Sequence, residues 1–440
     1  EIAQCLVGSE MCIRDRPKQE LGDYAFPCFR LAKTMHKAPN LIAADIKEAI
    51  GDIDFLDKID VQGAYLNFFV KKDIFVQTMI ESALKDNFGG SDEGADKVIC
   101  IDYSSPNVAK NFHVGHLRTT IIGNSLYKIY SKLGYKVIRI NHLGDWGTQF
   151  GKLIVAYKNW GTKEAVEKDG VAELMRLYVK FHEEADQNPE LVDEARAWFS
   201  KMEHGDEEAL SIWQWFKDIS LVEYKRTYDL LGMDFDYYLG ESFYRDKCQE
   251  VVDQLTNANL LKESEGAMIV DLSDYDMAPC IVTKKDGSSI YATRDLAAIF
   301  YRKNTYHFTK CLYVTGQEQK LHFAQVFKVV ELLGNDWAKD SLVHIPYGLV
   351  SLEGAKLSTR SGNIIYAEDI LHDAIKKSFE IISEKSPNLP DKEEVAKIVG
   401  VGSVLFNDLY NQRIKDVSFS WDKVLNFDGE TGPYVQYTHA

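Results

Sequence analysis

The stretch from Lys97 to Asn141 constrains the fold of this chain more than any other. Its first residues, KVICIDYSS, form a run of β-branched and apolar side chains that is typical of a buried parallel strand. Residues 116–132 then carry apolar side chains at helical spacing, and YKVIRIN (135–141) has the composition of a second strand. A strand, a helix and a strand within about 45 residues form a βαβ unit, which predicts an α/β fold with a doubly wound, Rossmann-like parallel sheet.

The residues before this unit predict a separate small domain. Residues 17–90 are expected to form an α+β domain, with two helices in 24–50 and a strand in 61–72. It ends near NFGGSDEGADK, a linker rich in glycine and aspartate. Residues 1–16 show neither pattern and are predicted to be non-native or disordered. The string CLVGSEMCIRDR reads like translated sequencing adapter, and an ordinary frayed terminus is the alternative.

The residues after the unit complete the sheet domain, which is predicted to span 94–365. Residues 153–232 are charged and aromatic with helical spacing, so they predict a helical insertion inside that domain. Strands are expected to resume at AMIVDL, CIVTKKDGSSIYAT, KCLYVTG and LVHIPYGLV. Residues 366–430 are predicted to be a helical connection, and 431–440 the first helix of a further domain that the chain truncates.

Composition excludes several classes of protein. Hydrophobic residues are 45% and charged residues 27% of the 440, as in a globular protein. No apolar run approaches the roughly 18 residues of a membrane span, and no secretory signal is seen. The seven cysteines are scattered without a C-x-x-C pair, which fits a reducing cytoplasm. A net charge of −16 argues against non-specific coating of nucleic acid but allows a local basic groove.

The sequence NVAKNFHVGHLRTT places His113 and His116 at the start of the predicted helix. A helix N-terminus presents free N–H groups that attract phosphate, and Gly115 lets a ligand approach the backbone closely. Imidazoles at that turn can donate to phosphate oxygens and stabilise charge that develops at phosphorus. A metal site is not expected, because no further ligand cluster accompanies the pair. Two histidines that only cap the helix are the remaining alternative.

A second motif, GAKLSTRSGN (354–363), follows the last predicted strand. Lys356, Ser358 and Arg360 lie between two glycines, in a cationic loop suited to binding the leaving phosphates. Taken alone, such a segment is more often a basic surface turn. Its combination with the two histidines on a βαβ sheet makes a phosphate site the more specific interpretation.

These motifs together resemble arginyl-tRNA synthetase, a class I aminoacyl-tRNA synthetase. The likeness runs from about Gly22 to Ala440 and rests on five segments: DYSSPNVAKNFHVGHLRTTIIGNSL, RINHLGDWGTQFGKL, IYATRDLAAI, GQEQKLHF and KLSTRSGNIIYAEDIL. HVGH matches the class signature HIGH, and the cationic loop matches KMSKS in degenerate form, with Thr359 at the second lysine. In this family the missing charge is supplied by a lysine just before HIGH, which is Lys110 here.

The resemblance also implies the substrate sites. Tyr291, at a strand end, and Asp295, in the first turn of a helix capped by Thr293, are expected to read the arginine side chain together with Gln319. Asp102, Asn107 and His113 are expected to hold its ammonium and carboxylate groups. Asp295 alone could simply favour its helix N-terminus. The residues implied for ATP are His113, Gly115, His116, Gly348, Leu349 and Lys356.

The resemblance implies ATP-dependent activation of L-arginine to arginyl-adenylate and transfer to the 3′ end of tRNA(Arg), with Mg²⁺ accompanying ATP. It also implies that activation needs bound tRNA, that residues 17–90 help to hold the tRNA elbow, and that the chain is a cytoplasmic monomer. Two alternatives stay open. A small-molecule nucleotidyltransferase shares the H-x-G-H logic, and a fragment without its anticodon-binding domain could bind RNA without catalysis.

Two further segments have no chemistry that follows from the sequence alone. In HLGDWGTQFG, Trp146 is as easily structural as substrate-binding, and Asp145 and Gln149 lie after a strand, where such sheets bind ligands. Trp198, Trp213 and Trp215 are expected to form the packing core of the helical insertion, whose surface could touch the tRNA acceptor end.

Overall fold

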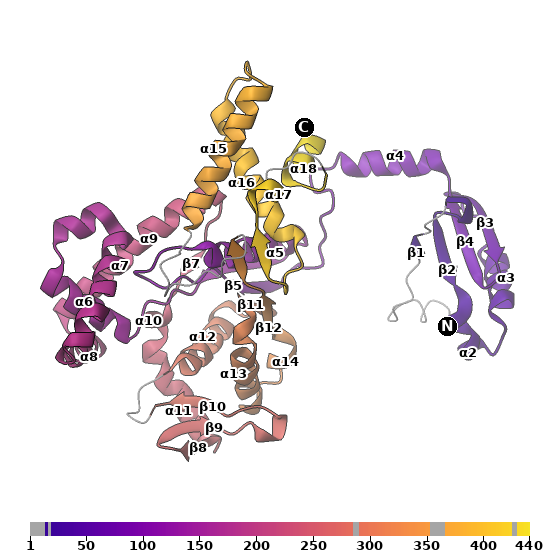
Figure 1. Ribbon diagram of the computed structural model, residues 1–440. Coiled ribbons are helices and arrows are strands. Elements are labelled where there is room, and N and C mark those ends of the chain that lie inside the picture. Colours follow the sequence, from indigo (N-terminus) through magenta and orange to yellow (C-terminus); the bar gives the residue numbers. More distant parts are fainter. Residues whose placement is uncertain (1–13, 16–18, 285–289, 353–365, 425–428) are drawn as a thin grey trace. The chain divides into compact units, whose positions relative to one another are not determined.

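A computed structural model describes residues 14–15, 19–284, 290–352, 366–424 and 429–440 (Figure 1). The chain divides into two compact units, Glu1–Gly90 and Ser91–Ala440. Each unit has its own hydrophobic core.

The first unit is built on an antiparallel sheet with the strand order β1-β2-β4-β3. Buried side chains of its strands and helices, among them Phe26, Ile42 and Leu66, form the core. The elements are β1 (Arg14–Asp15), β2 (Tyr24–Pro27), α2 (Leu31–Met35), α3 (Pro39–Ile50), β3 (Leu56–Gln62), β4 (Tyr65–Val70) and α4 (Lys72–Ala83).

Three expectations for this unit need correction. The predicted strand at 61–72 is a hairpin instead, since Gly63 at φ 60° turns the chain between β3 and β4. The segment 24–27 pairs with β4 as a strand before the two predicted helices begin. Arg14 and Asp15 pair with β2, so part of the segment predicted to be disordered belongs to the sheet.

The second unit contains the predicted parallel sheet, which has five strands in the order β12-β11-β5-β6-β7. All four neighbouring pairs are parallel, so the carboxyl ends of the strands lie along one edge. Helix α5 (Val114–Lys132) connects β5 to β6 as predicted. The strands are β5 (Val98–Asp102), β6 (Lys136–Asn141), β7 (Tyr237–Tyr238), β11 (Lys310–Gly316) and β12 (Leu342–Tyr347).

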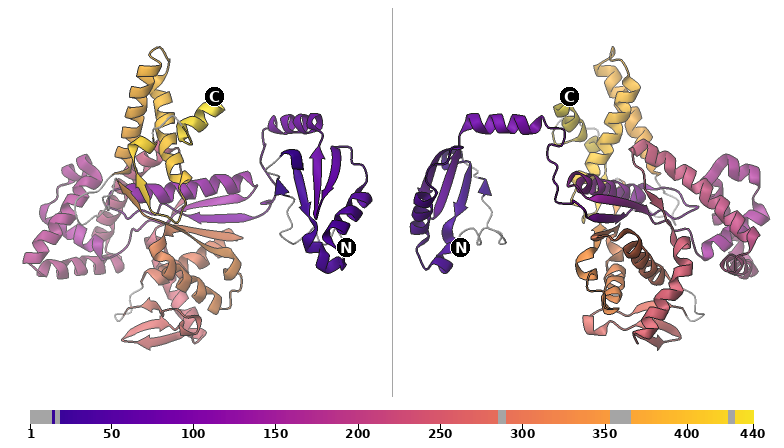
Figure 2. Two further views of the ribbon diagram at one scale, coloured as in Figure 1. Left: turned by 45° about the vertical axis from the view of Figure 1, so that its right-hand side comes forward. Right: turned by 180° about the vertical axis from the view of Figure 1, so that it is seen from behind.

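Side chains of the sheet alternate between two cores, as a strand period of two requires. Ile99 and Ile101 of β5 pack with α5 in one core, whereas Cys100 between them packs in the other. The views in Figures 1 and 2 show α5 on one side of the sheet and α12 (Tyr291–Tyr306) with α13 (Lys320–Leu332) on the other. The sheet is therefore doubly wound, which confirms the predicted α/β class.

The insertion is helical throughout, as predicted. Residues 148–231 contain no strand, and their helices gather to one side of the sheet (Figure 1). Trp198 and Trp213 are buried in the core and Trp215 packs against it. The helices are α6 (Thr148–Trp160), α7 (Lys163–Gln187), α8 (Glu190–Glu203) and α9 (Glu207–Leu231).

Two of the four strands expected to resume the sheet lie elsewhere. AMIVDL and CIVT contribute β9 (Ala267–Val270) and β10 (Cys280–Thr283), which form a separate antiparallel sheet with β8 (Leu261–Ser264). Between this sheet and β7 lie α10 (Glu241–Tyr244) and α11 (Cys248–Asn257). Short β-branched runs predict a strand but not its sheet, because pairing partners are set by packing.

The last part of the chain is mainly helical, with α15 (Ala367–Lys385), α16 (Lys392–Tyr410), α17 (Trp421–Val424) and α18 (Gly432–His439). The predicted connection at 366–430 is not purely helical, since β14 (Val417–Phe419) pairs in parallel with β13 (Val350–Leu352). Val417 and Phe419 are buried and Ser418 is exposed, so this short strand covers the core with one face.

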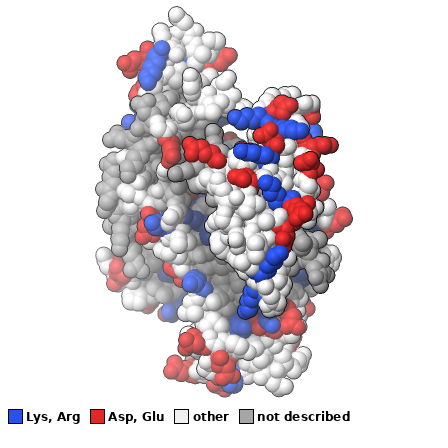
Figure 3. Space-filling model, turned by 90° about the vertical axis from the view of Figure 1, so that its right-hand side faces the viewer, with Lys and Arg blue, Asp and Glu red and all other residues white. Residues whose placement is uncertain are grey.

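On the face shown in Figure 3, Lys and Arg are interspersed with Asp and Glu, so the described residues form no large patch of one charge there. None of the described helices is both long and apolar enough to cross a membrane.

Candidate active site

A cavity of 530 Å³ lies at the carboxyl ends of β5 and β11, where a parallel sheet binds ligands. Its walls come from the loop after β5, the start of α5, the end of β11 and β13. Residues predicted for the site that line it are Asn107, His113, Gly115, His116, Gln319 and Leu349. The cavity therefore brings together the predicted phosphate-binding turn and part of the predicted arginine site.

The two histidines cap α5 and line the cavity at the same time. His113 is the N-cap residue, and its Nδ1 accepts a hydrogen bond from Gly115 N at 3.1 Å. His116 Nδ1 accepts from His113 N at 3.4 Å. The rings stack with their centroids 3.9 Å apart. Capping and ligand binding are thus not alternatives, because the caps use only one nitrogen of each ring.

The protonation of both rings follows from their surroundings. Burial, and then the nearby Lys110 ammonium, lower the pKa of His113. Burial, His113 and Lys110 lower the pKa of His116 well below its usual value. Near pH 7 both rings are therefore neutral, and because each Nδ1 accepts a hydrogen bond, each proton lies on Nε2. Each histidine offers one neutral N–H donor, and the exposed Lys110 supplies the positive charge beside them.

The loop between β5 and α5 is strained and is held by the insertion. Ser104, Ser105 and Ala109 have φ of 71°, 46° and 59°, a conformation that costs about 1–3 kcal/mol per residue. Tyr224 of α9 donates its hydroxyl to the backbone oxygens of Asn107 (2.6 Å) and Lys110 (2.7 Å). Helix α9 thus compensates for the strain and fixes the backbone that carries the predicted ligands.

The predicted cationic loop, with Lys356, Ser358 and Arg360, lies outside the described residues. Both of its flanks reach the cavity. On one side, Val350 and Ser351 of β13 line the wall. On the other, Tyr366 forms an antiparallel bridge with His113.

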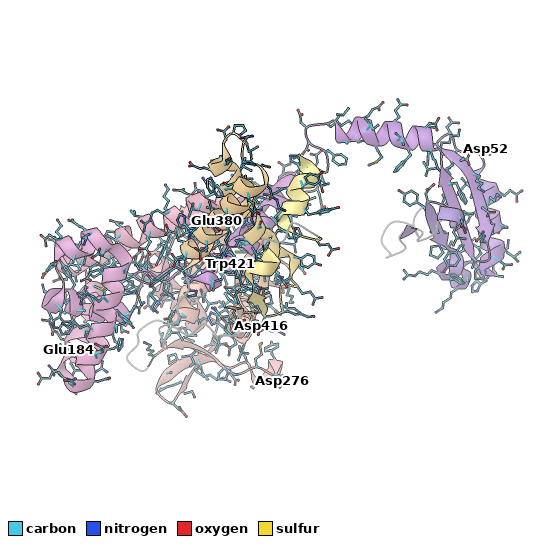
Figure 4. The ribbon with its side chains drawn as sticks, turned by 45° about the horizontal axis from the view of Figure 1, so that its top comes forward. Asp52, Glu184, Asp276, Glu380, Asp416 and Trp421 are labelled. Carbon is cyan, nitrogen blue, oxygen red and sulfur yellow. The ribbon has the colours of Figure 1, made fainter. Side chains whose placement is uncertain are left out.

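Gly348 and Leu349, predicted to bind ATP, are held by the C-terminal segment. Gly348 N donates to Arg413 O at 3.0 Å. Leu349 N donates to Asp416 Oδ1 at 2.7 Å, and Asp416, labelled in Figure 4, also lines the cavity. Arg118 Nη2 donates to Arg413 O at 3.1 Å, which ties this segment to α5. Neither backbone N–H is available to a nucleotide in this arrangement.

Asp102, at the end of β5, is predicted to bind the substrate ammonium and is already paired. Its Oδ2 lies 2.8 Å from Arg302 Nη2, and its Oδ1 accepts from Ser105 Oγ at 2.9 Å. Arg302 is fully buried and also contacts His142 Nδ1 at 3.2 Å. The arrangement fixes the orientation of the Asp102 carboxylate below the cavity.

The first turn of α12 carries Tyr291 and Asp295 on one face, because residues four apart are neighbours on a helix. Tyr291 is 64% exposed, and Asp295 Oδ2 lies 2.6 Å from His322 Nε2 of α13. The sequence interpretation of this turn needs two corrections. Tyr291 begins the helix rather than ending a strand, and the hydroxyl of Thr293 donates to Val282 O rather than capping the helix.

Glu241, at the start of α10, joins this turn and was missed by the sequence interpretation. Burial raises its pKa to about 7, opposed by Arg294, with which it forms an ion pair, and reinforced by the nearby Asp295 and Asp145. Glu241 was only weakly indicated by the sequence, because the strand before it, β7, has two residues and lies at the edge of the sheet. Two carboxylates, Glu241 and Asp295, together with Tyr291 form a group suited to a guanidinium.

Arg302 and Asp416 were also missed. Arg302 was detectable as a charge on the apolar stripe of α12, four residues after the buried Ala298. Asp416 had no local signal, because its contact with Leu349 joins residues 67 positions apart.

Asp145 and Trp146 have structural partners. Asp145 is fully buried, forms an ion pair with Lys217 at 2.6 Å and accepts hydrogen bonds from Ser242. The ring of Trp146 is buried against Trp213, with centroids 5.5 Å apart. In the part of the chain that the structure describes, no group of three or more His, Cys, Asp or Glu residues could hold a metal ion.

Comparison with known proteins agrees with this geometry at two levels. A family model described as the catalytic domain of class I tRNA synthetases (R) matches residues 79–421, so the chain contains the catalytic domain of a class I aminoacyl-tRNA synthetase. A model of the arginyl tRNA synthetase N-terminal domain matches residues 3–70. The chain belongs to the arginyl-tRNA synthetase family.

Individual relatives support the assignment. The chain is 59% identical to the arginine–tRNA ligase of Alkaliphilus metalliredigens over 426 residues, 96% of this chain and 75% of that protein. It is 57% identical to that of Clostridioides difficile over 433 residues, covering 98% and 76%. The Thermus thermophilus arginyl-tRNA synthetase structure, 23% identical, matches the fold with a TM-score of 0.82 over all of this chain and 78% of that one.

Proposed function

We propose that this chain is an arginine–tRNA ligase that activates L-arginine with ATP and transfers it to tRNA(Arg). The observation that carries the proposal is the N-terminus of α5, where two neutral histidines line a 530 Å³ cavity at the carboxyl edge of the sheet. The high identity to arginine–tRNA ligases supports the same activity for this chain.

In the first step the arginine carboxylate attacks the α-phosphorus of ATP, and pyrophosphate leaves. His113 and His116 donate Nε2–H to phosphate oxygens at the helix terminus, and Lys110 neutralises charge that develops there. No side-chain nucleophile is needed, because positioning and electrostatic stabilisation suffice for this transfer. Lys356, Ser358 and Arg360 would act from the opposite side of the phosphates.

The arginine lies between two groups of residues in this proposal. Asn107 and Asp102 bind its ammonium end near the cavity, and Gln319 borders the space. Tyr291 and Asp295 bind the guanidinium, and Glu241 adds a second carboxylate beside them. Mg²⁺ would arrive with ATP and neutralise phosphate charge, since ATP phosphates rather than protein cages are its usual ligands.

The second step moves the arginyl group to the 2′-hydroxyl of the terminal adenosine of tRNA. We assign residues 17–90 and the surface of the α6–α9 insertion to tRNA contacts. The strand pair β13–β14 connects the C-terminal segment to the residues directly before the cationic loop.

ATP–pyrophosphate exchange tests the proposal. Exchange that requires both arginine and tRNA supports it, whereas exchange with another acid in place of arginine would indicate a nucleotidyltransferase. Binding of tRNA without formation of arginyl-adenylate would indicate an RNA-binding protein.

A variant pair tests the guanidinium assignment. Asp295→Asn should abolish use of arginine while ATP binding persists. The control is Asp274→Asn, an exposed aspartate in the segment between β9 and β10, which should leave exchange unchanged. Unchanged arginine affinity in Asp295→Asn contradicts the assignment.

A further inference from the structure

The chain places a guanidinium of its own beside the proposed arginine subsite. Arg294 Nη1 forms an ion pair with Glu241 Oε2, and the side chains of both residues are only 11% exposed. The guanidinium carbon of Arg294 lies 5.3 Å from the centre of the Tyr291 ring. A guanidinium that pairs with a carboxylate and lies near an aromatic ring adopts the arrangement expected of a bound arginine side chain.

The position of Arg294 follows from the helix. Tyr291, Arg294 and Asp295 are the first, fourth and fifth residues of α12, and residues three and four apart share a face of a helix. From this position Arg294 pairs with Glu241 and lies beside the ring of Tyr291.

Arg294 stabilises the charged form of Glu241 when no substrate is bound. Glu241 is buried, and the nearby Asp295 carboxylate adds to the effect of burial in raising its pKa, so a cation beside Glu241 favours its charged form. Among the described residues, His322 contacts Asp295, whereas Arg294 forms the ion pair with Glu241 and compensates its charge. An arginine substrate brings the same guanidinium group to the same place.

We propose that Arg294 is an internal competitor for the guanidinium subsite, which pairs with Glu241 until the substrate guanidinium displaces it. The inference rests on the proposed function, because it requires the substrate side chain to bind at Tyr291 and Asp295. The ion pair sets the affinity for arginine, since only the fraction of molecules in which Arg294 has left Glu241 can bind fully. Arg294 is thus an affinity-determining residue rather than a catalytic one.

The test is calorimetric titration of arginine into the full chain with tRNA, for the wild type and Arg294→Gln. Glutamine keeps much of the length but not the charge. The dissociation constant for arginine should fall by about 10-fold, the factor expected when a competent population of about one-tenth becomes dominant. The KM for ATP and kcat of exchange should stay unchanged. Citrulline, which has a neutral side chain, should bind the variant no more tightly than it binds the wild type. A general loosening of the site would instead change the affinity for both citrulline and arginine.

Two further variants complete the test. Lys262→Gln removes a cation whose side chain is 64% exposed and ion-paired with Asp271, away from every assigned binding surface, and should leave the dissociation constant unchanged. Arg294→Lys keeps a cation beside Glu241 and should give an intermediate constant, which tests the inference even if the glutamine variant does not fold. Unchanged or weaker arginine binding by folded Arg294 variants overturns the inference. A wild-type protein that forms no arginyl-adenylate overturns the proposed function itself, and the inference with it.

Discussion

Replacing Arg302 by methionine removes the charge that compensates Asp102 and keeps most of the apolar volume. Arg302 is fully buried, and the side chain of Asp102 is 9% exposed, so water cannot replace the lost partner. Removal of one member of such a buried pair costs about 3–5 kcal/mol. We therefore expect Arg302→Met to lower the free energy of unfolding by that amount.

The double variant Arg302→Met with Asp102→Asn should recover most of this loss. Asparagine is neutral and can still accept from Ser105. Arg302 Nε and Nη1 have no hydrogen-bond partner among the described residues, so removing this guanidinium also relieves a cost of burial. The double variant should lie within about 1 kcal/mol of the wild type, because replacing a whole buried pair is often close to neutral.

Urea unfolding followed by tryptophan fluorescence measures these values. All seven tryptophans lie between residues 146 and 421, so the signal reports only the second unit. Arg226→Met, at an arginine with a 61% exposed side chain, is the control for loss of a guanidinium. A loss below about 1 kcal/mol in Arg302→Met, within the range of exposed ion pairs, would refute the reasoning.

Three further predictions follow from the same geometry. In Gly144→Ala the new Cβ would lie 2.1 Å from Asn107 Oδ1, so the amide must move and the KM for arginine should rise, which exchange kinetics against arginine concentration would show. His116→Asn keeps an acceptor for His113 N but loses the Nε2 donor, so kcat for exchange should fall by about 10²–10³ while helix content by circular dichroism persists; an unchanged kcat contradicts the donor role. Burial raises the pKa of Asp408 from 3.8 to about 6 despite the nearby Arg118. The folded protein therefore binds this proton more tightly than the unfolded chain, which adds about 3 kcal/mol to stability below pH 3.8. This stabilisation is lost as the pH rises through 6. Melting temperatures from pH 4 to 7 should fall less steeply in Asp408→Asn than in the wild type, and parallel profiles would contradict this.

Much of the local structure was predictable because it depends on residues close in sequence. The β-branched and apolar run in KVICIDYSS and the helical period that follows it predict β5 and α5, and the H-x-G-H motif predicts a polar helix N-terminus after that strand. The helical insertion was predicted from the charged and aromatic composition and helical spacing of residues 153–232. The same local patterns wrongly placed β9 and β10 in the main sheet, because strand propensity does not specify which strand a segment pairs with.

The sequence by itself determined the α/β class and the helix that carries His113 and His116, and it pointed to most of the residues proposed for the site. Only the tertiary structure decided how those residues are partnered. Asp102 pairs with Arg302, Glu241 with Arg294, and Leu349 with Asp416, across separations of 53 to 200 residues. Backbone periodicity is a short-range property, whereas the partner of a buried charge depends on which helices and strands pack together at the same depth.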